Sequence, residues 1–276
     1  MIKDMFLIKH LDWQREPNWT LSGFNKLFAT IAIHMIGNVL LIVLLRKEIK
    51  LLKTKYLKWW DIVIITLIML GPAIMNSTQI FMQGPPQQEN LIFTTQDDIR
   101  AIVIQSVQLA VAFVYLWLRK FEFRQWQFKI TLRHTLLGIG LFFLLGFMMD
   151  LVSFTTSGVA WIPEFLTENT PVIGALAAVT PSVVAFSLLN GFYEEIFFLG
   201  VCTSVEEKYQ KYAFIYAILI RVSFHTYQGI PSALGIGLFL GVMYYVLYRK
   251  KTQNLYPYML SHTFADIFGL SLLNFL

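Results

Sequence analysis

Residues 188–200 read LLNGFYEEIFFLG, and this stretch decides how the rest of the chain is interpreted. It places two adjacent carboxylates, Glu194 and Glu195, in an apolar segment that is expected to lie within a lipid bilayer. Ionisable side chains at membrane depth are energetically costly, so each is a candidate functional residue. On a helix the two side chains point about 100° apart, so they cannot face one reacting atom in the same way. We expect one glutamate to contact the reacting atoms and the other to bind a neighbouring helix or to orient the first glutamate.

The composition of the whole chain indicates a membrane protein. Of its 276 residues, 56% are hydrophobic and only 14% are charged, whereas about 25% are charged in a typical soluble domain. Much of the protein surface must therefore face lipid. The predicted fold class is all-α, a polytopic membrane helix bundle, with residues 1–276 forming a single integral membrane domain.

Apolar runs close to the ~20 residues that cross a bilayer divide the chain into helices. We predict about eight transmembrane helices, at 27–45, 61–82, 100–118, 134–155, 173–203, 212–228, 231–248 and 256–274. The fifth is long for one span and contains Pro181, so it is expected to be tilted, kinked or begun by an interfacial turn. The candidate site lies between the last four helices.

Lysine and arginine are concentrated in every second loop, which predicts the orientation of the bundle. The loops after the first, third, fifth and seventh helices are basic and are expected to be cytoplasmic, which puts both termini outside. This orientation conflicts with the basic residues of the N-terminal segment, which would lie outside: Lys3, Lys9, Arg15 and Lys26. An extra interfacial N-terminal helix, or seven spans in another register, therefore stays open. The net charge of +5 is explained by topology rather than by a nucleic-acid partner, and the composition favours a bacterial plasma membrane.

Two later helices carry further polar residues that match the glutamate pair. Arg221 and His225 are four residues apart, as are His262 and Asp266, so each pair shares a helix face. Together with the glutamates they predict a hydrolytic site inside the bilayer. An ion-pair network between helices and a proton relay of a transporter are the alternatives. Paired interrupted helices in matching halves, typical of inverted-repeat transporters, are not seen in the sequence.

The three segments resemble the motifs of the CPBP intramembrane proteases, the family of CAAX proteases and bacteriocin-processing enzymes that is also called Abi. Residues 194–200 resemble its EExxxR motif, 221–229 its second motif in bacterial members, and 262–266 its third motif. The resemblance covers 173–270, which is the expected catalytic core. One position departs from the pattern, because Leu199 stands where the family has arginine. We hypothesise that Arg221 supplies the missing charge; the alternative is a protein whose protease activity is weakened or lost.

The resemblance implies a glutamate-type peptidase without a cofactor. Glu194 and His225 would activate a water, His262 would stabilise the oxyanion, and Glu195 would be a supporting residue. Asp266 stands where some relatives have asparagine. An ionised aspartate cannot donate a hydrogen bond, so Asp266 would orient His262 or be protonated. The alternative is a catalytic zinc ion held by Glu194, His225 and His262.

Two functions are compatible with these residues. The first is an intramembrane endopeptidase that cleaves membrane-associated peptide or protein substrates. The second is a catalytically weakened scaffold or regulator that binds a membrane protein partner, such as a bacteriocin-immunity-type protein or a partner of a sensor kinase or cell-wall enzyme. The retained Glu194, His225 and His262 favour the first function, and Leu199 favours the second.

Overall fold

The fold comes from a computed structural model that describes residues 37, 56–83, 94–157 and 179–270. These segments are helical, and within them the only extended pairing is a single bridge between Gln127 and Asn254. The predicted helical membrane bundle is therefore confirmed. The first expected span, 27–45, lies outside the described residues apart from Gly37.

Three helices form one side of the bundle: α3 (Trp59–Met69), α4 (Gly71–Gln83) and α5 (Thr95–Leu118). The expected continuous span 61–82 is divided, because α3 and α4 meet at a bend of 64°. The sequence Gly71-Pro72 follows directly after the break. Proline has no backbone N–H and is tolerated in the first turn of a helix, so it favours a new helix at this point rather than a continuation.

A buried ion pair ties α3 to α5 at one end of this layer. Arg119 donates to the two oxygens of Asp61 from Nε at 2.6 Å and from Nη2 at 2.8 Å, and the Tyr115 hydroxyl donates to the same carboxylate at 2.5 Å. All three side chains are buried. The pair fixes the position of α5, which packs against the helix that carries the glutamates.

That central helix is α9 (Pro181–Glu195), which continues as the wider π-helical segment η5 (Ile196–Val201). The described part of α9 begins with Pro181 in its first turn, and the Thr180 side chain accepts a hydrogen bond from the backbone N–H of Val183. The fifth predicted span is therefore not one continuous helix in the described residues, because a helix starts at Pro181. Residues 173–178 of the expected span lie outside the described residues.

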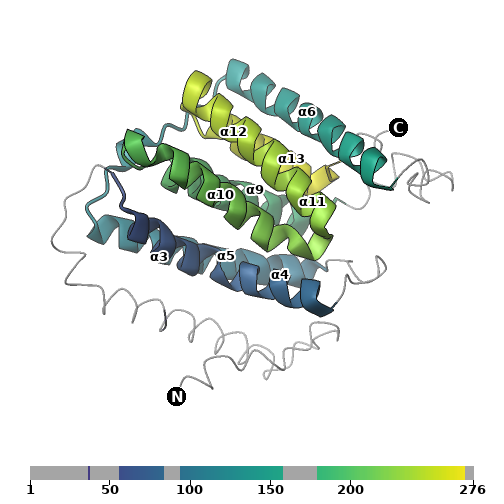
Figure 1. Ribbon diagram of the computed structural model, residues 1–276, viewed down its shortest axis with the longest axis horizontal. Coiled ribbons are helices and arrows are strands. Elements are labelled where there is room, and N and C mark those ends of the chain that lie inside the picture. Colours follow the sequence, from purple (N-terminus) through teal and green to yellow (C-terminus); the bar gives the residue numbers. More distant parts are fainter. Residues whose placement is uncertain (1–36, 38–55, 84–93, 158–178, 271–276) are drawn as a thin grey trace.

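The remaining helices surround α9. They are α6 (Leu132–Ser157), α10 (Gln210–His225), α11 (Ile230–Gly235), α12 (Gly241–Leu247) and α13 (Tyr256–Phe268). Short 3-10 or π-helical segments lie beside them: η3 (Phe123–Gln125), η6 (Glu207–Tyr209), η7 (Thr226–Gln228), η8 (Ile236–Leu240) and η9 (Tyr248–Thr252). As Figure 1 illustrates, α13 lies between α6 and α9, while α10 packs on α4.

Gly191 allows α9 and α13 to approach closely. A Cβ atom at this position would lie 2.7 Å from Thr263 Oγ1 and 2.8 Å from the Met259 carbonyl oxygen. Any larger residue would therefore push the two helices apart. The glutamates lie one turn beyond Gly191, so this contact brings them next to α13.

Within the described segments, four helices are long and apolar enough to cross a membrane: 95–118, 132–155, 181–201 and 230–252. The bent pair α3 and α4 adds a fifth if it is counted as one broken span. Helices α10 and α13 have 16 and 13 residues, fewer than the ~20 that a full span needs. Gly269, with φ of 81°, ends α13 earlier than predicted.

The basic loops meet at one end of the bundle, as the charge pattern predicts. Lys58 pairs with Glu206 at 3.0 Å, and Arg249 pairs with Glu207 at 2.6 Å. The Trp126 indole donates to Ser204 Oγ at 3.0 Å, which brings the loop after α5 to the same end. Four loops that are far apart in sequence therefore share one face.

Candidate active site

Glu194 and Glu195 end α9 immediately before the π-helical turn, and both are buried. Single π-helical turns inside α-helices often occur at functional sites. The two side chains have different hydrogen-bond partners, as expected from their angular separation on the helix. One glutamate joins helices and the other faces the interior of the site.

Glu195 is the glutamate that joins helices. Arg221 Nη2 on α10 donates to its Oε1 at 2.9 Å and to its Oε2 at 3.2 Å. His262 Nδ1 on α13 lies 2.7 Å from Oε1. The ion pair expected between Arg221 and one of the two glutamates is therefore present, and it involves Glu195. Because an ionised carboxylate only accepts hydrogen bonds, His262 donates from Nδ1.

Asp266 was expected to orient His262 or to be protonated, and both roles stay predictions. The hydrogen bond at His262 Nδ1 is made by Glu195. The other nitrogen, His262 Nε2, lies 3.7 Å from Asp266 Oδ1 and 3.7 Å from Glu194 Oε2. The imidazole ring is thus anchored on one side and faces two further carboxylates on the other.

Asn190 connects those two carboxylates. Its Nδ2 donates to Glu194 Oε1 at 3.2 Å and to Asp266 Oδ2 at 2.9 Å, while its Oδ1 accepts from Gln105 Nε2 on α5 at 2.7 Å. Neither amide was predicted as a site residue. A signal did exist, since Asn190 lies one helical turn before Glu194 and Gln105 is a polar residue within a predicted span.

Glu194 keeps one carboxylate oxygen free. Its Oε2 is buried and has no hydrogen-bond partner within the described part of the chain. Buried polar atoms are usually paired, and an exception needs an explanation. Here this oxygen lies 3.7 Å from His262 Nε2, so a molecule beside the two side chains can contact both atoms.

His225 lies at the end of α10, at the edge of this network. Its Nδ1 is 2.8 Å from the Arg221 carbonyl oxygen, which only accepts, so Nδ1 carries a proton and Nε2 is the acceptor of the neutral ring. Among the described residues, no hydrogen bond or ion pair joins His225 to either glutamate. The structure therefore joins five of the predicted residues directly and leaves His225 beside them.

The same donors were considered for zinc. In the described segments, no group of three or more His, Cys, Asp or Glu side chains is arranged to hold a metal ion. Both histidines use Nδ1 in hydrogen bonds within the protein, which leaves Nε2 of each ring as the nitrogen that could bind a metal. The zinc site built from Glu194, His225 and His262 therefore stays an untested alternative prediction.

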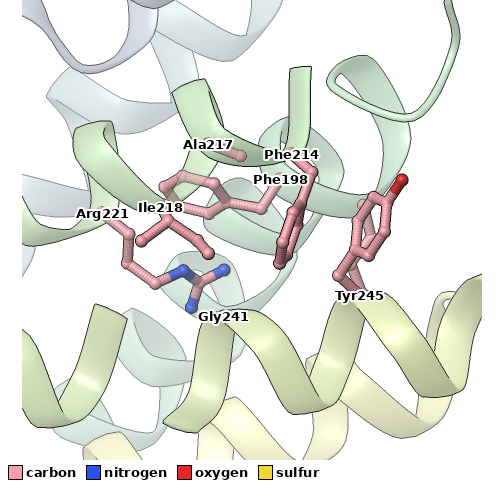
Figure 2. A pocket seen from close by; sticks show the side chains of 8 residues that line it. Phe198, Phe214, Ala217, Ile218, Arg221, Gly241 and Tyr245 are labelled. Carbon is pink, nitrogen blue, oxygen red and sulfur yellow. The ribbon is translucent and has the colours of Figure 1, made fainter. Parts of the chain in front are cut away.

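Arg221 has a mostly apolar environment apart from Glu195. Its guanidinium carbon lies 3.9 Å from the centre of the Phe198 ring, a cation–π contact. A small pocket adjoins the side chain, and Figure 2 shows the guanidinium between Phe198 and Gly241. The pocket is lined by Phe198, Leu199, Phe214, Ala217, Ile218, Arg221, Gly241 and Tyr245. Its cavity volume is about 10 Å³, roughly the space that one water molecule needs, so it does not explain substrate binding.

Leu199, at the position of the missing motif arginine, is a packing residue. It is 2% exposed and belongs to an apolar cluster with Ile236 and Tyr244. The cation that pairs with Glu195 comes instead from Arg221. Cys202 is also buried.

Comparison with known families supports the interpretation of the motifs. Residues 176–268 match the family model described as Rce1-like, type II CAAX prenyl endopeptidase. Comparisons with curated proteins and with solved structures gave no match. The matched segment contains every residue of the polar network except Gln105. Roughly a third of this membrane protein therefore matches the protease family that its motifs predicted, the Rce1-like type II CAAX prenyl endopeptidases.

Proposed function

We propose that this protein is an intramembrane endopeptidase that hydrolyses peptide bonds of membrane-associated peptides or proteins. One observation carries the proposal: Oε2 of Glu194, which has no hydrogen-bond partner among the described residues, lies 3.7 Å from Nε2 of His262, whose other nitrogen is held by Glu195. A free base and an oriented imidazole at one buried place are suited to acid–base catalysis. The family match supports a peptide substrate.

Glu194 acts as the general base in this mechanism. Its free oxygen takes a proton from a water molecule, and the water oxygen bonds to the carbonyl carbon of the substrate. His225 assists, because its Nε2 can accept a hydrogen bond from the same water. The electron pair of the carbonyl π bond moves to oxygen. When it returns, the C–N bond breaks and Glu194 delivers the proton to the leaving nitrogen.

His262 stabilises the oxyanion by donating from Nε2 in its doubly protonated form, since Nδ1 also carries a proton. Glu195 supports it by accepting the Nδ1 proton, and Arg221 balances the charge of Glu195. The imidazole is therefore held in one orientation before substrate arrives, as electrostatic stabilisation requires. Asp266 is the most exposed of the three site acids, with 23% of its side chain accessible, and we place it at the entrance of the site.

The test is cleavage of membrane-tethered peptides by the purified protein. The peptides should include prenylated and unprenylated versions of one sequence, so that the substrate class is read out together with activity. Glu194→Gln should lower kcat by at least about 100-fold, the lower range for the loss of an acid–base group. Glu207→Gln is the matched control, because Glu207 lies in the exposed loop segment η6 and pairs with Arg249. Equal rates for wild type and Glu194→Gln would refute the proposal.

A non-catalytic scaffold in the membrane is the second candidate. It is favoured by Leu199, which occupies the position of the motif arginine and packs in the apolar core. A scaffold predicts that Glu194→Gln and His225→Ala keep the cellular phenotype at normal protein levels. A protease predicts that both lose it. We assign the protein to a bacterial plasma membrane in either case.

A further inference from the structure

The Asn190 side chain makes three hydrogen bonds: two to carboxylates of the site and one to Gln105. Nδ2 donates to one carboxylate on α9 and one on α13, and Oδ1 accepts from α5. The residue is nearly buried, with 9% of its surface exposed. Its amide therefore joins three helices at the point where Glu194 and Asp266 come together.

Two carboxylates held close together in a low-dielectric interior repel each other when both are ionised. The cation Arg221 is engaged by Glu195 and donates to neither of them. A neutral amide whose two N–H groups point at Glu194 and Asp266 lowers this repulsion and fixes the distance between them. It also fixes the direction of Glu194, because Oε1 is held and Oε2 is left for the reaction.

An asparagine amide has nearly the same shape after a 180° flip, so shape alone does not keep Nδ2 facing the acids. Ionised carboxylates only accept, so they favour Nδ2 on their side, and Gln105 adds a donor on the other side. Its Nε2 donates to Asn190 Oδ1 at 2.7 Å, which is possible only when Oδ1 faces α5 and Nδ2 faces the carboxylates. If the Asn190 amide were flipped, its carbonyl oxygen would face Glu194 and Asp266 and add to the repulsion.

We propose that Asn190 is a positioning residue for the Glu194 base and that Gln105 acts through it by setting the orientation of its amide. The inference rests on the proposed function. It also extends the functional unit beyond residues 176–268, because Gln105 lies on α5, outside the matched segment.

The variants are chosen to separate positioning from packing. Leucine is close to asparagine in shape but cannot donate, so Asn190→Leu removes the hydrogen bonds and keeps most of the volume. We expect kcat to fall by about 10-fold to 100-fold, the range seen when a residue that orients an active-site group is lost. KM should change by less than about 3-fold, because the substrate contacts are unaltered.

Gln105→Leu should lower kcat in the same way but less, by about 10-fold at most, since Nδ2 can still face the acids part of the time. Gln108→Leu is its matched control: Gln108 is a buried amide on the same helix, and it accepts from the Tyr193 hydroxyl rather than from the acid network. The control should keep kcat within about 3-fold of wild type. The double variant Gln105→Leu/Asn190→Leu should be no slower than Asn190→Leu alone, because Gln105 acts only through Asn190.

Kinetics should be measured on protein whose thermal unfolding in detergent resembles that of wild type. If Asn190→Leu fails to fold, the proposal is tested by comparing kcat of Gln105→Leu with kcat of Gln108→Leu. The positioning role would be overturned if Asn190→Leu kept the wild-type kcat, or if Gln105→Leu and Gln108→Leu lowered kcat equally. It would also be overturned if the fall in kcat of the double variant were the product of the two single falls. These results differ from failure of the proposed function, which would appear as an inactive wild type or an active Glu194→Gln.

Discussion

At the scale of single residues, Arg221 and Glu195 form a buried ion pair within the site. The two side chains are 1% and 0% exposed. Removing one partner of a buried pair leaves an uncompensated charge, at a cost of about 3–5 kcal/mol unless the remaining group takes a proton. Arg221→Leu should therefore be strongly destabilised, and Arg221→Leu/Glu195→Gln should recover much of the loss. Glutamine keeps an acceptor for His262 Nδ1, so that hydrogen bond survives.

The measurement for this prediction is thermal unfolding of the purified variants in detergent. Glu195→Gln alone is the control, because it leaves Arg221 unpaired and should also be destabilised. A double variant that unfolds as early as Arg221→Leu would contradict the assignment of Glu195 as the partner that determines stability.

Leu199 gives a second prediction at this scale. The family motif has arginine at this position, but here the side chain lies in the apolar core and the required cation is already supplied by Arg221. Leu199→Arg should therefore bury an unpaired charge and lower both stability and the amount of folded protein. Leu199→Met, which nearly conserves volume, should cost less than about 1.5 kcal/mol. A Leu199→Arg protein as stable as wild type and more active would show that Arg221 has not replaced the motif arginine.

At the scale of helices, the contact between α9 and α13 holds the site together. A Cβ at Gly191 would collide with Thr263 Oγ1 and the Met259 carbonyl oxygen, at 2.7 and 2.8 Å. Gly191→Ala should push α13 away and lengthen the contact between Glu195 and His262. We expect a loss of about 1–3 kcal/mol in stability, the usual cost of overpacking, and a fall in kcat. Unfolding and cleavage assays on the same preparation measure both.

Gly140→Ala is the matched control for this prediction. Gly140 lies in α6, and nothing is within 4 Å of a Cβ built there. Because alanine is favoured over glycine in helices by up to about 1 kcal/mol, this variant should be as stable as wild type or slightly more stable. If the two alanine variants behave alike, close packing at Gly191 is not what positions α13.

At the scale of the whole molecule, the loops that carry most of the positive charge share one end of the bundle. The positive-inside rule assigns that end to the cytoplasm. In a Cys202→Ser background, Lys208→Cys and Lys250→Cys should resist a membrane-impermeant maleimide in intact cells and react after permeabilisation. Gln83→Cys, at the exposed end of α4, should react in intact cells. The opposite labelling pattern would invert the topology.

Much of the architecture could be predicted from local features of the sequence. Long apolar runs predict helices that lie in a membrane. The rare polar residues within those runs identify the candidate site residues Glu194, Glu195, His225 and His262. The break at Leu70 was missed because the apolar run was taken as one span, although Gly71-Pro72 marks the break in the sequence. Asn190 and Gln105 were missed because amides are common contacts between membrane helices, and their importance depends on what they touch.

The sequence by itself determined that the chain forms a helical membrane bundle and that its C-terminal third carries the motifs of a protease family. Both follow from residue type and spacing, which are properties of one segment at a time. Only the tertiary structure decided that Glu195 holds Arg221 and His262 while Glu194 keeps a free oxygen. The physical reason is that two glutamates adjacent in sequence are chemically identical. They acquire different roles only when each meets the side chains of other helices.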